Sequence, residues 1–264
     1  METQKKNKLI LISSALYVLM TLIGFALYLG TNNPIVSVIA GSFMAVLPVP
    51  LYVLGVYLLD RKEPEPKLLL LLVFVWGSTI AILISLVINT VVLKLAGSTI
   101  SAVVSAPIIE ELSKGAAIFL LFFFRRKDIN GILDGIVYGS MVGLGFAMTE
   151  NLFYYIRSIS ASGFMGGLST FWARGVLTPY AHPLFTMMTG IGFAISANTN
   201  KKWLRKKAPI LGISTAILLH AVWNGSSLLG VGGFDVIYYL LFAPILVLVV
   251  VGTWTGIFKK EEKL

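Results

Sequence analysis

Long apolar runs alternate with short polar connections along the whole sequence. Each run holds about the 20 apolar residues that a helix needs to cross the roughly 30 Å hydrocarbon core of a bilayer. The connections are too short to hold a soluble domain. The pattern therefore predicts an all-α, polytopic membrane protein in which residues 1–264 form a single domain. Its eight predicted transmembrane helices lie near residues 9–29, 35–59, 68–96, 101–124, 132–156, 172–197, 208–230 and 234–258.

The composition agrees with a chain that lies almost wholly within the bilayer. Hydrophobic residues make up 57% of the chain and charged residues 12%, and the mean hydropathy is +0.88. A soluble domain carries about 25% charged residues. The chain has no cysteine, which excludes disulfides, thiolate catalysis and cysteine-based metal sites. We therefore expect a multi-pass protein of the cell membrane.

Basic residues fall on every second connection, and the alternate connections hold few of them. Because cytoplasmic loops of membrane proteins are enriched in lysine and arginine, both termini are predicted to be cytoplasmic. The formal net charge of +9 is then a signal of topology. It predicts contact with anionic lipid headgroups and does not indicate a nucleic-acid partner. The basic groups are Lys5, Lys6 and Lys8; Arg61, Lys62 and Lys67; Arg125, Arg126 and Lys127; Lys201, Lys202, Arg205, Lys206 and Lys207; and Lys259, Lys260 and Lys263.

Ionisable residues interrupt the apolar runs at a common depth. Glu110, Glu111 and Lys114 lie within one predicted helix, although a charge at the bilayer centre costs at least about 2.5–3.5 kcal/mol. That helix runs inward in the predicted topology, which places Glu110 about 15 Å below the outer surface at 1.5 Å per residue. The same reasoning brings polar groups of three further helices into the outer half of the bilayer, namely Glu150, Asn151, His182, His220 and Asn224.

Several of these residues also have an interpretation without catalysis. Glu110 or Glu111 can form an ion pair with Lys114 within one helix. His220 and Asn224 are four residues apart and can hydrogen-bond between helices. One lysine neutralises only one carboxylate, however, so the second glutamate favours a functional site.

Two features describe the predicted surroundings of these residues. Arg157 and Arg174 are interpreted as interfacial residues. Glycines at every fourth position of helix 132–156 predict a close-packed stripe, and Glu150 is expected to face protein because it lies near this stripe. The glycines are Gly131, Gly135, Gly139 and Gly143.

Two common hydrolase signatures are absent from the sequence, H-E-x-x-H and G-x-S-x-G. The glutamates, histidines and asparagine of the predicted site can still activate water. A carboxylate accepts the proton, and imidazole or amide groups stabilise an oxyanion. The same residue types also bind divalent metals such as zinc. The residues alone therefore leave metal-free and metal-dependent hydrolysis open.

Four motifs in chain order resemble the PrsW family of intramembrane proteases. They are Glu110-Glu111-x-x-Lys114, Phe146-x-x-x-Glu150-Asn151, His182-Pro-Leu-Phe-Thr186 and His220-x-x-x-Asn224. The connection "LDRKEPEPKLLLL", with Asp60 and Glu63-Pro64-Glu65-Pro66, is similar to that family as well, and the likeness spans about residues 45–230.

PrsW proteins belong with the CAAX-protease and bacteriocin-processing superfamily. The first motif of that superfamily is usually a glutamate pair with a later arginine, and the second is a phenylalanine followed by a histidine. Lys114 and Glu150 stand in those places here, as in the PrsW branch, so prenyl-protein processing is not expected.

The resemblance implies an intramembrane endopeptidase. It would hydrolyse a peptide bond of a membrane-anchored protein, such as an anti-sigma factor, near the extracytoplasmic side. Glu110 or Glu111 would be the general base that activates water, and the other would position the water or pair with Lys114.

The remaining residues have expected roles around that water. His182 completes the water or metal site with the help of Glu150, and His220 and Asn224 hold the oxyanion. The sequence favours a metal-free mechanism and keeps a divalent metal such as zinc as the alternative. The candidate metal ligands are Glu111, Glu150, His182 and His220.

Two other classes of protein stay open. Buried glutamate, histidine and lysine also occur in proton-coupled transporters, but the sequence shows no internal repeat and no matched pair of broken helices. A non-catalytic membrane scaffold is the third interpretation.

Overall fold

The computed structural model describes residues 35–61 and 63–258, and all the regular secondary structure in these ranges is helical. The predicted all-α class is confirmed, since the structure is 91% helix and the described residues form no strand. The longer helices are α2 (Ile35–Val46), α3 (Val49–Leu59), α4 (Lys67–Trp76), α5 (Ile82–Ile100), α6 (Ala106–Arg125), α7 (Ile132–Phe171), α8 (Ala181–Asn198), α9 (Lys202–Ser226), α10 (Gly230–Ile237) and α11 (Ala243–Thr255). Short helical turns join them, namely η1 (Gly77–Ala81), η2 (Ser101–Ser105), η3 (Arg126–Asp128), η4 (Trp172–Leu177), η5 (Ser227–Leu229) and η6 (Tyr238–Phe242).

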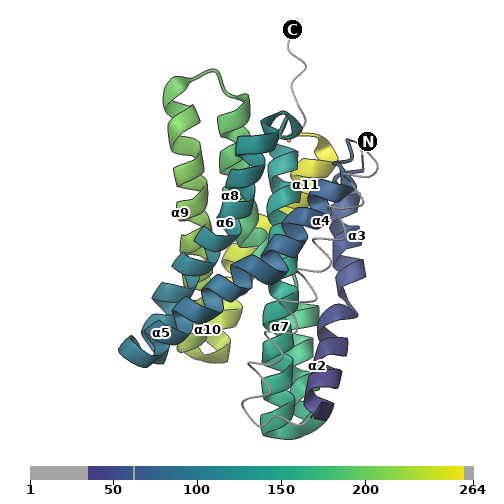
Figure 1. The fold of residues 1–264 in the computed structure, drawn as a ribbon, viewed down its shortest axis with the longest axis vertical. Helices are drawn as coiled ribbons and strands as arrows, with labels where there is room; N and C mark the ends of the chain where they lie inside the picture. The colour runs from purple at the N-terminus through teal and green to yellow at the C-terminus, as the bar shows by residue number, and fades with distance from the viewer. Residues whose placement is uncertain (1–34, 62, 259–264) are drawn as a thin grey trace.

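Five helical segments in the described part of the chain are long and apolar enough to cross a membrane. Two of them have 62 and 67 residues, about three times the length that one crossing needs. Each contains a glycine with a positive φ, Gly97 at 85° and Gly163 at 71°. At both glycines the backbone leaves helical geometry, and Figure 1 shows the chain doubling back after α5 and within α7. The five segments are Ile35–Leu59, Lys67–Asp128, Ile132–Asn198, Lys202–Leu229 and Gly232–Thr255.

These reversals fall at two of the connections that the hydrophobic pattern predicts. The total of eight transmembrane helices stays a prediction, because the first predicted helix, near residues 9–29, lies outside the described residues. The predicted helix 35–59 is divided into α2 and α3. Pro48 and Pro50 stand at this break, and proline has no N–H to continue a helical hydrogen-bond ladder.

Helix α7 organises the bundle and packs against α2, α3, α4 and α8. The glycines of α7 allow its backbone to lie directly against that of α8. A Cβ on Gly135 would lie 2.3 Å from the Gly190 carbonyl oxygen of α8, and one on Gly143 would lie 2.6 Å from the backbone nitrogen of Pro183. Gly139 contacts α8 in the same way, so the predicted close-packed stripe is confirmed at these three glycines. This contact fixes the start of α8 beside α7.

The basic connections gather at one end of the bundle. The α6–α7 and α8–α9 connections lie together with the last turns of α11 at the upper end of Figure 1. Glu110 lies near the first turn of α6, and α6 ends at this basic end. The predicted site and the basic connections therefore lie toward opposite ends of the bundle, as the charge alternation predicts. The side of the membrane on which each end lies stays a prediction.

The α3–α4 connection is fixed to the start of α7 by buried acidic groups. The backbone N–H of Glu65 donates to Asp60 Oδ2 at 2.7 Å, and Tyr138 donates from its hydroxyl to Glu65 Oε2 at 2.5 Å. Asp134 caps the start of α7 by accepting from the backbone N–H groups of Asn130 and Gly131. Asp134 thus lies at the basic end, away from the predicted site.

Burial changes the acidity of this connection. It raises the pKa of Glu65 from 4.5 to about 8, with repulsion from Asp134 acting in the same direction and the Tyr138 hydrogen bond acting against it. Burial also raises the pKa of Asp60 from 3.8 to about 6, against the effect of the hydrogen bond from the Glu65 backbone.

Candidate functional site

Lys114 on α6 lies at the centre of a polar cluster formed by Glu110, Glu111, Lys114, Glu150, His182 and His220. Its Nζ donates to Glu111 Oε1 at 2.7 Å and lies 3.5 Å from Glu110 Oε2. The same Nζ is 3.0 Å from His182 Nδ1 and 3.8 Å from the ring centroid of Phe146. A wholly buried ammonium group requires such partners, because an unpaired charge in the protein interior is strongly destabilising.

Glu111 is wholly buried, and other side chains engage both of its oxygens. Oε1 contacts Lys114 and lies 3.1 Å from His220 Nδ1, while Oε2 accepts from the hydroxyl of Thr186 at 2.9 Å. The glutamate therefore fixes the lysine, one histidine ring and the start of α8 relative to α6.

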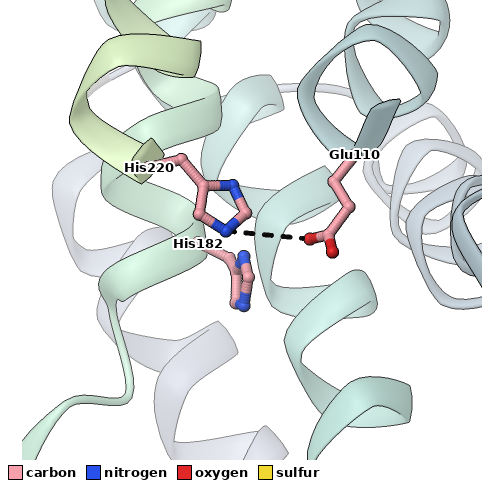
Figure 2. Close-up of side chains that lie close together, drawn as sticks. All are labelled: Glu110, His182 and His220. Atoms are coloured by element: carbon pink, nitrogen blue, oxygen red, sulfur yellow. Dashed lines mark ion pairs between the residues drawn. The ribbon is translucent and has the colours of Figure 1, made fainter. Parts of the chain in front are cut away.

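The two histidine rings have different partners. His220 donates from Nδ1 to Glu111 when Nδ1 carries the proton, and its Nε2 then faces Glu110 Oε2 at 3.8 Å (Figure 2). His182 accepts from Lys114 at Nδ1 and donates from Nε2 to Glu150 Oε2 at 2.9 Å. The ring of Phe185 stacks on His220 and meets His182 edge-on, which restricts the orientation of both rings.

Three members of the polar cluster can hold a metal ion. One donor atom each from Glu110, His182 and His220 lies within 4.8 Å of the others, and all three residues are buried. Figure 2 shows their side chains converging from separate helices. Two imidazoles and one carboxylate form a common zinc donor set. The hydrogen bond between His220 and Glu111 is the kind of outer contact that orients a metal-binding histidine.

The geometry groups Glu110 with the two histidines, whereas the sequence analysis named Glu111 and Glu150 as the candidate carboxylate ligands. Contacts explain this difference. Both oxygens of Glu111 are hydrogen-bonded, and Glu150 is paired with Arg174 and His182.

A cavity of about 570 Å³ borders the polar cluster. Glu110, Glu150, His182, His220 and Asn224 line it, while Glu111 and Lys114 lie behind its wall. The amide nitrogen of Asn224 donates to the Ala102 carbonyl of η2 at 2.8 Å. The rest of the lining is mainly aromatic and apolar and includes Tyr154, Trp223, Phe234, Tyr238 and Tyr239.

The side chain of Arg174, interpreted from sequence as an interfacial residue, lines this cavity, and its position relative to the membrane interface stays a prediction. Its Nη2 forms an ion pair with Glu150, and its Nε donates to Asn151 Oδ1 at 2.7 Å. The predicted depths could have indicated the pairing of Glu150 with Arg174. Glu150 near the outer end of one helix and a lone arginine at the start of the next lie at similar depth. Thr186 was also missed as a functional residue, although it stands one turn after His182.

A family model described as "PrsW family intramembrane metalloprotease" matches residues 65–250, a range that contains the whole polar cluster. Similar curated proteins carry the name Protease PrsW. The one from Geobacillus kaustophilus (strain HTA426) is 29% identical over 148 residues, which cover 55% of this chain and 62% of the relative. The one from Clostridioides difficile (strain 630) is 26% identical over 189 residues, which cover 69% and 76%. No solved structure matches the chain.

The apolar helices and the buried Glu–His–Lys cluster define a helical membrane protein with a site of hydrolase type. The chain belongs to the PrsW family, which confirms the resemblance seen in its motifs. It spans just under two thirds of the length of the Geobacillus relative. The description of the family as a metalloprotease favours the metal-dependent alternative over the metal-free one.

Proposed function

We propose that this chain is an intramembrane endopeptidase that hydrolyses a peptide bond of a membrane-anchored protein. The observation that carries the proposal is the convergence of Glu110, His182 and His220 on a cavity of about 570 Å³ within apolar helices. A carboxylate and two imidazoles at this spacing can bind water, accept its proton and stabilise the developing oxyanion.

Glu110 is the reactive glutamate of the site: without a metal it accepts the proton of water, and with a metal bound it would be a ligand. It lines the cavity, and its contacts with Asn89, Lys114 and His220 are 3.5 to 3.8 Å long. Glu111 has shorter contacts to both oxygens and does not line the cavity. Glu110 Oε2 and His220 Nε2 are too far apart for a direct hydrogen bond, at a separation that suits a shared water molecule.

Glu110, His182 and His220 would also hold the metal ion that the family description implies, with zinc the candidate by ligand type. His182 would bind it through Nδ1 in place of the contact with Lys114, while Nε2 stays hydrogen-bonded to Glu150. A metal bound there would lower the pKa of water and polarise a carbonyl group. Around these residues, Lys114 supplies a buried positive charge, and Asn224 supplies an amide N–H at the cavity wall. Glu110 is required whether or not a metal is bound.

The substrate is proposed from position and family. The cavity is lined by residues near the starts of α6 and α8, and both helices end at basic connections. The positive-inside rule assigns the end remote from those connections to the extracytoplasmic side. Aromatic and aliphatic lining residues suit the apolar segment of a membrane-anchored substrate. The family resemblance suggests an anti-sigma-factor-like regulator.

The experiment uses the purified chain in liposomes with a panel of membrane-anchored candidate substrates, with and without a chelator. The proposal predicts a defined cleavage product that disappears on chelation and returns when zinc is added. Proton flux without cleavage of any substrate would instead favour the transporter alternative.

A further inference from the structure

Arg174 lies in η4, the helical turn that leads into α8, and local hydrogen bonds fix its backbone. The backbone N–H and the hydroxyl of Thr178 both donate to the Ala173 carbonyl, at 3.2 Å and 3.0 Å. These bonds close the turn immediately after the arginine. From this turn the guanidinium group reaches α7.

The guanidinium group of Arg174 holds two consecutive residues of α7. Nη2 pairs with Glu150 Oε2, and Nε donates to Asn151 Oδ1 at 2.7 Å. Its central carbon also lies 3.8 Å from the ring centroid of Tyr154, one turn further along the helix. A planar guanidinium can make these contacts together through separate nitrogen atoms, whereas lysine has a single nitrogen and cannot.

The same glutamate oxygen links Arg174 to the proposed hydrolytic site. Glu150 Oε2 accepts from Arg174 on one side and from His182 Nε2 on the other, at 2.9 Å. His182 is one of the three candidate metal ligands. The orientation of its ring is set by this contact and by the contact of Nδ1 with Lys114. Without Arg174, the Glu150 carboxylate would lose the partner that fixes it and could rotate away from His182.

We propose that Arg174 is a positioning residue, which holds Glu150 in place so that Glu150 orients the His182 ring toward Glu110 and His220. The inference rests on the proposed function, and it assigns a role in the site to a residue that lies outside the four sequence motifs. Arg174 also lines the cavity, so direct contact with the substrate is the competing role that the tests separate.

The first test is kinetic. Arg174→Gln should lower kcat by about 10- to 100-fold with KM unchanged, the usual effect of losing an outer-shell partner. Arg174→Lys keeps the charge and should retain several-fold more activity than Arg174→Gln. Arg157→Gln, at an exposed arginine of α7, is the matched control and should leave kcat unchanged. A raised KM with unchanged kcat would overturn the proposal in favour of substrate binding.

The second test is a double-mutant cycle between Arg174 and Glu150. If Arg174 acts through Glu150, Arg174→Gln should change the rate by less than about twofold when Glu150→Gln is already present, because coupled residues are not additive. An undiminished effect of Arg174→Gln in that background would mean that it acts on the substrate directly, and would refute the positioning role.

The third test needs no catalysis, so it separates failure of this inference from failure of the proposed function. The chain has two histidines, which gives two sets of ring ¹⁵N NMR signals in histidine-labelled protein, assigned with His220→Gln. Arg174→Gln should shift or broaden the His182 signals and leave those of His220 in place, while Arg157→Gln should change neither set. Unchanged His182 signals in Arg174→Gln and Arg174→Lys would overturn the inference even if the parent chain cleaves its substrate.

Discussion

Glu110 and Glu111 are neighbours in the sequence but have different surroundings. Glu111 is enclosed by Lys114, His220 and Thr186, with no exposed surface. Glu110 lines the cavity and has only longer contacts. One turn of α6 thus supplies a group that positions its neighbours and a group that can face water.

The hydrogen bond from Thr186 to Glu111 provides a test of this division of roles. Thr186→Val keeps the shape of the side chain but leaves a buried carboxylate oxygen without its donor, which should destabilise the fold by about 1–3 kcal/mol. The midpoint temperature of thermal unfolding and the cleavage rate should both fall in Thr186→Val, and Thr186→Ser should keep both near the parent values.

Thr189 on the same helix supplies the matched control. It is equally buried, and its hydroxyl has no partner in the described part of the chain. Thr189→Val should therefore be neutral or stabilising. Equal losses in the two valine variants would show that the Thr186 hydrogen bond has no special role.

At the scale of the elements, the site depends on how α7 contacts α8. Gly143 meets the backbone at His182 and Pro183 so closely that a Cβ would lie 2.6 Å from the nearest atom. The glycine spacing predicted this contact from sequence, because small residues at every fourth position share one helix face. The break at Pro48 divides one predicted helix, and the reversals at Gly97 and Gly163 fall at predicted connections, so neither changes which helices carry the site residues.

The α3–α4 connection should make stability depend on pH. The folded protein binds a proton at Glu65 more tightly than the unfolded chain, since burial raises its pKa from 4.5 to about 8. The stability from this proton is complete below about pH 4.5 and is lost as the pH rises toward 8. Glu65→Gln is neutral at every pH and keeps an acceptor for Tyr138.

Thermal unfolding measured from pH 5 to pH 8 checks this expectation. The parent should lose stability relative to Glu65→Gln over that range, and the exposed Glu63→Gln should follow the parent. Parallel curves for the parent and Glu65→Gln would contradict it.

For the whole molecule, helix periodicity and charge alternation predict the class of fold and the depth at which the polar residues meet. They cannot separate Glu110 from Glu111, because that distinction arises from the packing of α8 and α9 against α6. They also miss the pairing of Arg174 with Glu150, since the direction of a side chain at a helix end depends on the local turn of η4. Sequence motifs locate the site, and tertiary contacts assign its residues to their proposed roles.

The central claim is that the site around Glu110 hydrolyses peptide bonds, and Glu110→Gln tests it most directly. The substitution is nearly isosteric but removes the carboxylate that would accept the proton or bind a metal. With a membrane-anchored substrate in liposomes, the cleavage rate should fall by about 100-fold or more, with cooperative unfolding retained and Glu63→Gln as active as the parent. Cleavage by Glu110→Gln at the parent rate would contradict the account.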